Sequence, residues 1–590
     1  MKTRHYVRTL LASALLSVFA VPSQAHDKSD QLGKVSFHAS CTPKAHKQFE
    51  TGLAMLHSYW FGEARKTFEA ALKDDPNCAM AYWGIALDYL GNSLSAPPQA
   101  KNAQLAWEAL QKAHAIGAKT QRERDWIEAL TTYYRDHDKV PVNVRLAAYT
   151  RASAALTEKY PDDYEAWVFY ALNLQASAPK NDVTYKQQRQ STQILETLLH
   201  KNPEHPGVVH FLIHGYDYPP LADKGIVAAR RYGKLAPAAP HARHMPSHIY
   251  SMVGMWEDSI ASNEHSLQVR PDYYHAMDFI VYAQLQLAQD SKAQATLQRA
   301  RDVAAKAATS DLGMNTALSA MPARIVLERG DWKAAGAMPV TSTNSPMAES
   351  LSRFTRGLGL ARTGDYAGAR AEVAVMQKLR AQLEKTNNSY WADRTEEQML
   401  SVLAWVALGE GNKEQAEKFM RTAADNEDGS VKHVAMENRL YPLRELYAEL
   451  LLEMGQARPA LAEYEAALKA YPNRYRSILG IARDNMESHR EKMTEGLKAD
   501  VLVTSAGVSG GDRDLVRQAV QAFLDLQIGF RQIDRVIAHV MNSVPHGAAD
   551  SIAAVMAQDA VARQAAQQRS EEHTSELQSH HDLVCRLLLE

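Results

Sequence analysis

Residues 49–76 read FETGLAMLHSYWFGEARKTFEAALKDDP, and this stretch decides the fold. Small residues, one aromatic residue and one proline stand in it at a fixed spacing: Gly52, Ala64, Phe68, Ala71 and Pro76. Small side chains let two helices touch, the aromatic ring fills the groove between them, and the proline ends the second helix. The stretch therefore predicts a pair of antiparallel helices.

The same spacing returns along the chain, which indicates an internal repeat. A clear later copy is Gly455, Ala460, Tyr464, Ala467 and Pro472. The pattern resembles the tetratricopeptide repeat, a helix pair of about 34 residues. We expect repeats to begin near residues 45, 79, 164, 206, 240, 274, 316, 350, 397 and 441, with insertions between some. The predicted fold class is all-α, a tetratricopeptide-type α-solenoid over residues 45–478.

The chain opens like a secretory signal peptide. A basic start (Lys2, Arg4 and Arg8) precedes a short apolar run at residues 10–21 and a small-residue cleavage site that ends at Ala25. The run is shorter than the roughly 20 residues that span a bilayer, and no later segment is long and uncharged. We expect cleavage after Ala25, export to the periplasm or medium, and no membrane span.

Overall charge and cysteine content fit an ordinary exported protein. The net charge of −2 gives no reason to expect nucleic acid as a partner. Cys41 lies in the N-terminal segment (residues 26–44) before repeat one, and Cys78 stands before the equivalent helix of repeat two. Such helix starts are neighbours in a solenoid, so a disulfide would staple the N-terminal cap, since oxidising compartments favour pairing. Two free thiols are the alternative.

Five motifs resemble a group of exported bacterial repeat proteins, and the resemblance covers about residues 30–478. The motifs are the SC at residues 40–41, LHSYWFGEA at 56–64, CAMAYWGIALDYLGN at 78–92, HPGVVHFLIHGYD at 205–217 and HMPSHIY at 244–250. The resemblance implies no settled biochemical activity.

The sequence changes character near residue 479. Residues 479–517 resemble a piece of a molybdopterin molybdenumtransferase, and residues 518–568 resemble the final helices of 1-deoxy-D-xylulose 5-phosphate reductoisomerase. Residues 569–590, which begin RSEEHTSELQS, resemble a translated sequencing adapter. We therefore expect a chimera with a foreign, poorly integrated C-terminal segment, whose enzyme fragments are inactive because their partner parts are missing. A natural extension is the alternative.

Histidines concentrate in the repeats that begin at residues 206, 240 and 274. The pairs His210/His214 and His244/His248 have the i, i+4 spacing that puts both side chains on one helix face. The second, fifth and ninth places of the first helix face the concave groove in tetratricopeptide arrays. These places hold the candidate metal ligands, which are His210, His214, His241, His244, His248, His275 and Asp278.

An imidazole-rich patch suits zinc, copper, nickel or iron, with a carboxylate as a possible oxygen ligand. Tyr216, Asp217 and Tyr282 are candidates to orient the imidazoles. Pro246 is tolerated if it lies in a first helical turn and would kink the helix if it lies deeper. Two alternatives need no metal: a polar groove whose histidines bind one another and water, and recognition of a peptide carboxylate.

The leading functional hypothesis is an exported solenoid that binds a ligand in its concave groove, in the sharpest form through the histidine metal site. One rival is a protein-interaction scaffold that holds an extended peptide in that groove. The other is a metal-dependent enzyme of unknown reaction. Neither a nucleophile-elbow motif nor a Ser-His-Asp arrangement is evident, so the sequence favours a role other than catalysis.

Overall fold

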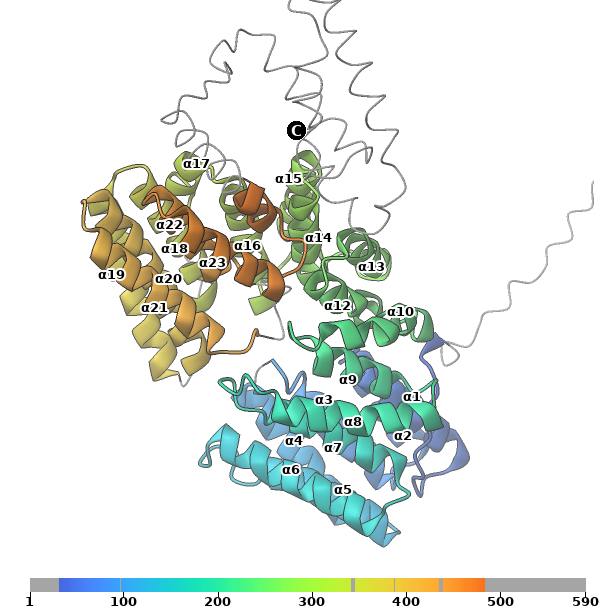
Figure 1. Cartoon of the computed structure of the whole chain (residues 1–590). Helices are drawn as coiled ribbons and strands as arrows, with labels where there is room; N and C mark the ends of the chain where they lie inside the picture. The colour runs from blue at the N-terminus through green and yellow to red at the C-terminus, as the bar shows by residue number, and fades with distance from the viewer. Residues whose placement is uncertain (1–30, 96, 341–344, 387, 434–438, 483–590) are drawn as a thin grey trace, which may run out of the picture.

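The structure is a computed structural model that describes residues 31–482, except residues 96, 341–344, 387 and 434–438. The described part is helical throughout and contains no β-strand (Figure 1). The expected signal peptide, and the C-terminal segments from residue 483 onward, lie outside the described residues.

The first half of the solenoid contains ten α-helices and one short 3-10 helix. They are α1 (Pro43–His57), α2 (Glu63–Asp74), α3 (Ala79–Leu90), α4 (Ala100–Ile116), α5 (Gln121–Tyr134), α6 (Val142–Lys159), α7 (Tyr164–Ala176), α8 (Lys186–Lys201), α9 (Pro206–Tyr216), η2 (Ala222–Gly225) and α10 (Ile226–Leu235). Neighbours in this order pack as pairs, beginning with α1 on α2 and α3 on α4.

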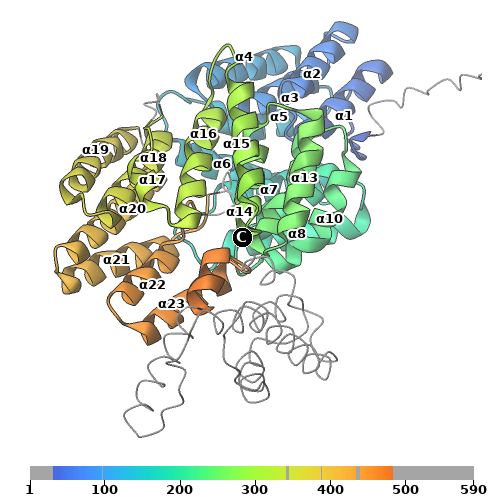
Figure 2. The same ribbon diagram turned by 90° about the horizontal axis from the view of Figure 1, so that it is seen from above.

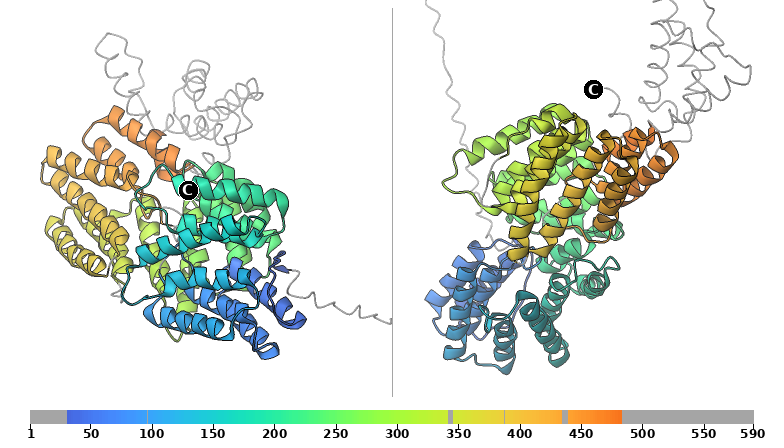
Figure 3. Two further views of the ribbon diagram at one scale, coloured as in Figure 1. Left: turned by 90° about the horizontal axis from the view of Figure 1, so that it is seen from below. Right: turned by 90° about the vertical axis from the view of Figure 1, so that its left-hand side faces the viewer.

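The second half continues the same arrangement. Its helices are α11 (Pro240–His244), α12 (Pro246–Met252), α13 (Trp256–Val269), α14 (Tyr274–Gln286), α15 (Asp290–Ala304), α16 (Leu312–Arg329), α17 (Trp332–Gly336), α18 (Pro346–Arg362), α19 (Tyr366–Lys385), α20 (Ser389–Gly409), α21 (Lys413–Asp428), α22 (Leu443–Glu453) and α23 (Ala457–Ala470). The pairs follow one another in a curved row (Figures 2 and 3), so the predicted all-α solenoid of helix pairs is confirmed.

The repeat spacing located most helices correctly. The predicted starts at residues 79, 164, 206, 240 and 274 coincide with the first residues of α3, α7, α9, α11 and α14. One pair, α5 with α6, was not predicted. It begins with a capping box in which Thr120 and Glu123 exchange side-chain and backbone hydrogen bonds, a signal that the sequence also carries.

Phe68 explains why the small residues recur. Its ring is fully buried between α1 and α3, and an added Cβ at Gly52 or Gly84 would lie 2.7 Å from it. A larger residue at either glycine would overlap the ring, so the helices approach closely only with glycine there.

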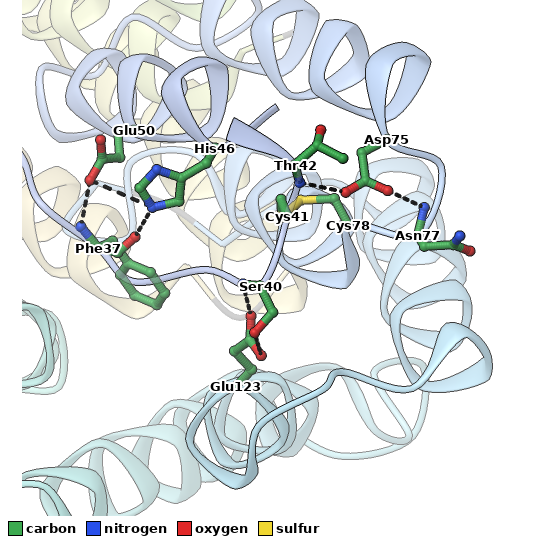
Figure 4. Close-up of a disulfide and its surroundings, with 10 residues drawn as sticks. All are labelled: Phe37, Ser40, Cys41, Thr42, His46, Glu50, Asp75, Asn77, Cys78 and Glu123. Atoms are coloured by element: carbon green, nitrogen blue, oxygen red, sulfur yellow. Dashed lines mark hydrogen bonds and ion pairs between the residues drawn. A yellow bond between two sulfur atoms is a disulfide. The ribbon is translucent and has the colours of Figure 1, made fainter. Parts of the chain in front are cut away.

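A disulfide joins Cys41 to Cys78 across the first two repeats, with their Cα atoms 4.9 Å apart (Figure 4). Beside it, the Thr42 amide donates to the Asp75 carboxylate at 2.8 Å. A bridge of this sequence separation, 37 residues, removes loop entropy from the unfolded chain. Its expected contribution to stability is about 4 kcal/mol.

Pro246 divides the first helix of its repeat in two. It stands at the first position of α12, where a missing N–H costs nothing, and Met245 alone separates α11 from α12. The His248 amide donates to the Met245 carbonyl at 3.1 Å. His244 and His248 therefore stand on successive short helices.

The chain after α23 returns to the middle of the solenoid and lies beside α14 (Figure 2). The Trp256 indole donates to the Asn473 carbonyl at 3.0 Å, which ties α13 to this segment. Arg474, fully buried, pairs with Glu328 and Glu445 at 2.8 Å each. Two buried carboxylates around one guanidinium fix this closure, because either partner alone would leave an uncompensated charge.

After α21 the chain runs toward α9 (Figure 1). The Val431 amide donates to the Lys180 carbonyl at 3.0 Å, and the Lys432 ammonium lies 2.9 Å from Asp217. Residues 431–432 therefore pack against the first half of the solenoid. No helix among residues 31–482, where they are described, has the length and apolar character needed to cross a membrane.

Candidate metal centre

Six histidines from three consecutive repeats meet near Asp217. Helix α9 supplies His210 and His214, α11 supplies His241 and His244, α12 supplies His248, and α14 supplies His275. They form two groups, each with three ring nitrogens within 4.8 Å of one another. The first triad is His210, His214 and His241; the second triad is His244, His248 and His275. Together they are the histidine cluster.

Most of the cluster is buried, but each triad has one half-buried member. His210 and His244 are 0% exposed, His248 is 1% exposed and His214 is 3% exposed, whereas His241 and His275 are partly exposed. The sequence pattern placed the histidines correctly but said nothing of the distant segment that brings Lys432 to Asp217.

In the second triad, hydrogen bonds fix where the ring protons lie. The Asn263 amide nitrogen donates to the Ser259 carbonyl at 2.8 Å, so its oxygen is left to accept from His244 Nδ1 at 2.6 Å. His248 Nδ1 donates to the Asp217 carboxylate at 2.9 Å. Both rings therefore carry their proton on Nδ1, and both Nε2 atoms present a lone pair.

These two lone pairs face each other, because His244 Nε2 and His248 Nε2 are 3.0 Å apart. No proton is available for a hydrogen bond between neutral rings with these tautomers. In a tetrahedral site with metal–nitrogen bonds of about 2.0–2.1 Å, two ligand nitrogens lie about 3.3 Å apart. The separation thus fits two ligands of one ion.

In the first triad, His210 donates its Nδ1 proton to the His57 carbonyl at 2.6 Å. Its Nε2 lies 3.1 Å from His241 Nε2, and His241 Nδ1 lies 3.0 Å from the Tyr273 hydroxyl. A hydroxyl both donates and accepts, so Tyr273 suits either tautomer of His241. The facing Nε2 atoms of His210 and His241 can therefore share either one proton, in a hydrogen bond, or one metal ion.

His214 completes the first triad and lacks a hydrogen bond altogether. Both of its ring nitrogens are buried without a partner among the described residues. Its ring centroid lies 4.7 Å from that of His210 and 6.0 Å from that of His248. Leaving a buried polar group unpaired costs about 1–3 kcal/mol. A bound ion would remove that cost.

Burial keeps the histidine cluster neutral, the form that binds metal. Desolvation lowers the pKa of His210 to about 3 and that of His244 to about 4. Desolvation, and then the neighbouring histidines, hold the pKa of His214, His241 and His275 well below the usual value. Desolvation likewise raises the pKa of Asp217, to about 6, against the opposing effect of Lys432.

Three other residues that the sequence analysis assigned to the site bind partners outside the histidine cluster. Asp278 belongs to neither triad, and its carboxylate lies 3.2 Å from Arg324 Nε. The Tyr216 hydroxyl donates to Glu196, because two residues along α9 turn it to another face than His214. The Tyr282 hydroxyl accepts from Arg474 at 3.1 Å, and its ring packs on Trp256.

The predicted orienting role falls to Asp217 and to residues that the sequence pattern did not reveal. Asp217 holds His248, as expected. Asn263, Tyr273 and the His57 carbonyl hold His244, His241 and His210. Tyr273 directly precedes α14 and Asn263 lies on a second helix of a repeat, and nothing in their local sequence marks them. This arrangement resembles metal sites in which each imidazole donates its other N–H to an acceptor.

A third buried group, the His–Glu–His bridge, lies beside the cluster. His57 Nε2 lies 2.9 Å and His205 Nε2 lies 2.7 Å from the two oxygens of Glu165. His205 Nδ1 accepts from the Val208 amide, so its proton is on Nε2 and points at the carboxylate. Burial opposes ionisation of Glu165, but the two imidazoles hold its pKa below the usual range. Its carboxylate is already satisfied by N–H donors.

Comparison with known proteins bears on the C-terminal part of the chain. Residues 460–561 match the family described as "Probable molybdopterin binding domain". A stretch of 48 residues is 56% identical to 1-deoxy-D-xylulose 5-phosphate reductoisomerase of Janthinobacterium sp. (strain Marseille), and it makes up 8% of this chain. The chain spans 12% of that enzyme's length. Both matches support the resemblances read from the sequence, but the family match begins within α23 and extends past residue 517, across most of the stretch that the sequence assigned to the reductoisomerase.

Solved structures similar to this chain include repeat proteins of low sequence identity. The Cut9–Hcn1 hetero-tetramer of the APC/C is 12% identical over 77% of this chain and 78% of that chain, with a TM-score of 0.35. The human IFIT1 dimer with m7Gppp-AAAA is 14% identical over 64% of this chain and 80% of that chain, with a TM-score of 0.31. The P58(IPK) TPR domain is 13% identical over 76% of this chain and 99% of that chain, with a TM-score of 0.21.

Proposed function

We propose that this tetratricopeptide-type solenoid binds transition-metal ions at the histidine cluster. One observation carries the proposal: His244 Nε2 and His248 Nε2 lie 3.0 Å apart, and each presents a lone pair to the other. The protons of both rings are on Nδ1, where they are donated to Asn263 and Asp217. A buried cation is the simplest partner for two such acceptors. The doubly unpartnered ring of His214 supports the same conclusion.

The ligand set indicates the class of metal. All members of both triads are imidazoles, which suit zinc, copper and iron better than the oxygen-binding ions calcium and magnesium. His210, His241, His244 and His248 would bind through Nε2, since Nδ1 of each has a hydrogen-bond partner. Asp217 would keep His248 in the tautomer that ligates.

Metal analysis of the full chain, purified without a histidine tag, tests this proposal. The wild-type protein is expected to retain zinc or copper after dialysis, whereas the variant His244→Ala/His248→Ala is expected to retain less. His265→Ala is the matched control, because His265 is exposed on α13. Wild-type protein that binds neither metal when folded, as judged by circular dichroism, would contradict the proposal.

Export and a foreign tail remain proposals about the same chain. The disulfide between Cys41 and Cys78 supports an oxidising compartment, because such bonds rarely persist in the cytosol. The two matches to unrelated enzymes behind one repeat array support a chimeric C-terminus. Mass spectrometry of the mature protein from its native host tests both, since it reads the first and last residues directly.

A further inference from the structure

We propose that the histidine cluster holds two neighbouring ions, one in each triad, and that the ions share a small anionic ligand. This inference rests on the proposed function. It differs from a single-ion site in the number of ions, in the ligands of each ion and in the coupling between them.

Each triad is complete as a ligand set. The nitrogens of each lie within 4.8 Å of one another, and each triad contains its own close Nε2 pair, at 3.1 Å in the first and 3.0 Å in the second. A single four-coordinate ion would use one of these pairs and leave members of the other triad unpaired. Two ions use all six rings.

The two triads adjoin each other. The shortest ring-to-ring contacts lie inside the triads, with centroids 4.7 Å apart for His210 and His214 and 4.6 Å apart for His244 and His275. Across the boundary, the ring centroids of His241 and His244 are 5.8 Å apart, which is less than the 6.2 Å between His214 and His241 within the first triad. Two ions, one in each triad, would therefore be close neighbours.

Three protein ligands leave a fourth position open on a tetrahedral ion. Two adjacent ions with open positions can share one exogenous ligand, as two-metal sites do. Charge indicates what that ligand is. Imidazoles bind metal as neutral rings, and Asp217 is already paired with Lys432, so a hydroxide or another small anion would offset part of the charge of the two cations.

Metal stoichiometry of matched single variants tests the proposal. His241 and His275 are the least buried members of their triads, so His241→Ala and His275→Ala each remove one ligand from one triad at the smallest risk to folding. Wild-type protein loaded with copper(II) is expected to bind two ions per chain. Each variant is expected to retain one ion tightly and to bind the other at least tenfold more weakly.

Electron paramagnetic resonance adds a readout of proximity. Two copper(II) ions with a shared anion couple, so the wild-type signal is expected to integrate to fewer spins than the copper bound. Either variant is expected to recover the signal of one isolated copper. Addition of azide is expected to shift the visible absorption of the wild-type protein, since the exogenous ligand is exchangeable.

The outcomes separate this inference from the proposed function. Absence of bound metal overturns both. One ion per wild-type chain, lost equally in both variants, overturns the two-ion site and leaves the metal-binding proposal standing. Two ions whose signals integrate fully overturn the shared ligand. If a variant fails to fold, the substitutions His241→Gln and His275→Gln serve the same test with a side chain closer in volume.

Discussion

The histidine cluster and the His–Glu–His bridge are both rich in imidazole and lie next to each other. The bridge comes from α1, α7 and the residue before α9, whereas the cluster comes from α9, α11, α12 and α14. The two groups differ in where their protons lie. In the bridge, N–H groups point at the Glu165 carboxylate; in the cluster, Nε2 lone pairs of His244 and His248 point at each other. Histidine density and burial alone therefore do not indicate a metal site, and the direction of the ring protons is what supports the metal-binding proposal for the cluster.

The largest effect on stability is expected when the carboxylate that bridges the two histidines is removed. Glu165→Ala leaves the ring N–H groups of His57 and His205 buried without an acceptor, and each such group costs about 1–3 kcal/mol of unfolding free energy. Urea denaturation measures the loss. The copper content of the folded variant is expected to match the wild type. A variant that keeps its stability but loses metal would show that the bridge itself is a ligand set.

The second test measures how much added metal stabilises the protein. An ion that binds the native state but not the unfolded state raises the free energy of unfolding. When the free ion concentration is 100 times the Kd, the increase is about 2.7 kcal/mol for each ion. His248→Ala is expected to lose at least one such increment, measured as the difference between urea midpoints with and without zinc. His265→Ala serves as the control. Equal gains in His248→Ala and wild type would refute the assignment of His248.

The third test weakens an orienting contact and spares the ligands. Asp217→Asn keeps an oxygen that accepts from His248 but removes the charge that holds Lys432. Mutation of such an orienting partner, here from a charged to a neutral acceptor, is expected to lower metal affinity about 10–100-fold, which corresponds to about 1.4–2.7 kcal/mol. Competition with a chromogenic chelator measures the affinity. An unchanged Kd would mean that Asp217 serves only to pair with Lys432.

The smallest effect is a pH dependence of the bridge. The folded-state pKa of Glu165 is lowered, so its contribution is present above the unfolded pKa of about 4.3 and is lost as pH falls toward the folded value. The stability difference between wild type and Glu165→Gln is therefore expected to hold from pH 7 to pH 5. Below about pH 4 it declines by at most about 1.4 kcal/mol per pH unit. A decline centred near pH 6 would point to the imidazoles instead.

Much of the fold could be predicted from the sequence, because the packing of each helix pair requires small and aromatic residues at a fixed spacing. Gly52 and Gly84 must be small for Phe68 to fit, and that requirement is visible in the sequence itself. The α5–α6 pair lacks this spacing and was missed. The gathering of the six histidines was also predicted, since equivalent places in successive first helices lie side by side in a solenoid.

The rest depended on partners far away in the chain. Asp278 and Tyr282 stand on α14 with His275, yet Arg324 of the next repeat and Arg474 after α23 bind them. Lys432 lies 215 residues along the chain from its partner Asp217. The residue pattern within one repeat does not predict which side chains from later parts of the chain will contact it.

The contact between Lys432 and Asp217 has a consequence for timing. During synthesis from the N-terminus, α9 to α14 emerge before the segment that contains Lys432. The site of the proposed metal is thus formed before Lys432 reaches Asp217. On our proposal, metal loading is expected to be easier before the second half of the solenoid has folded than afterwards.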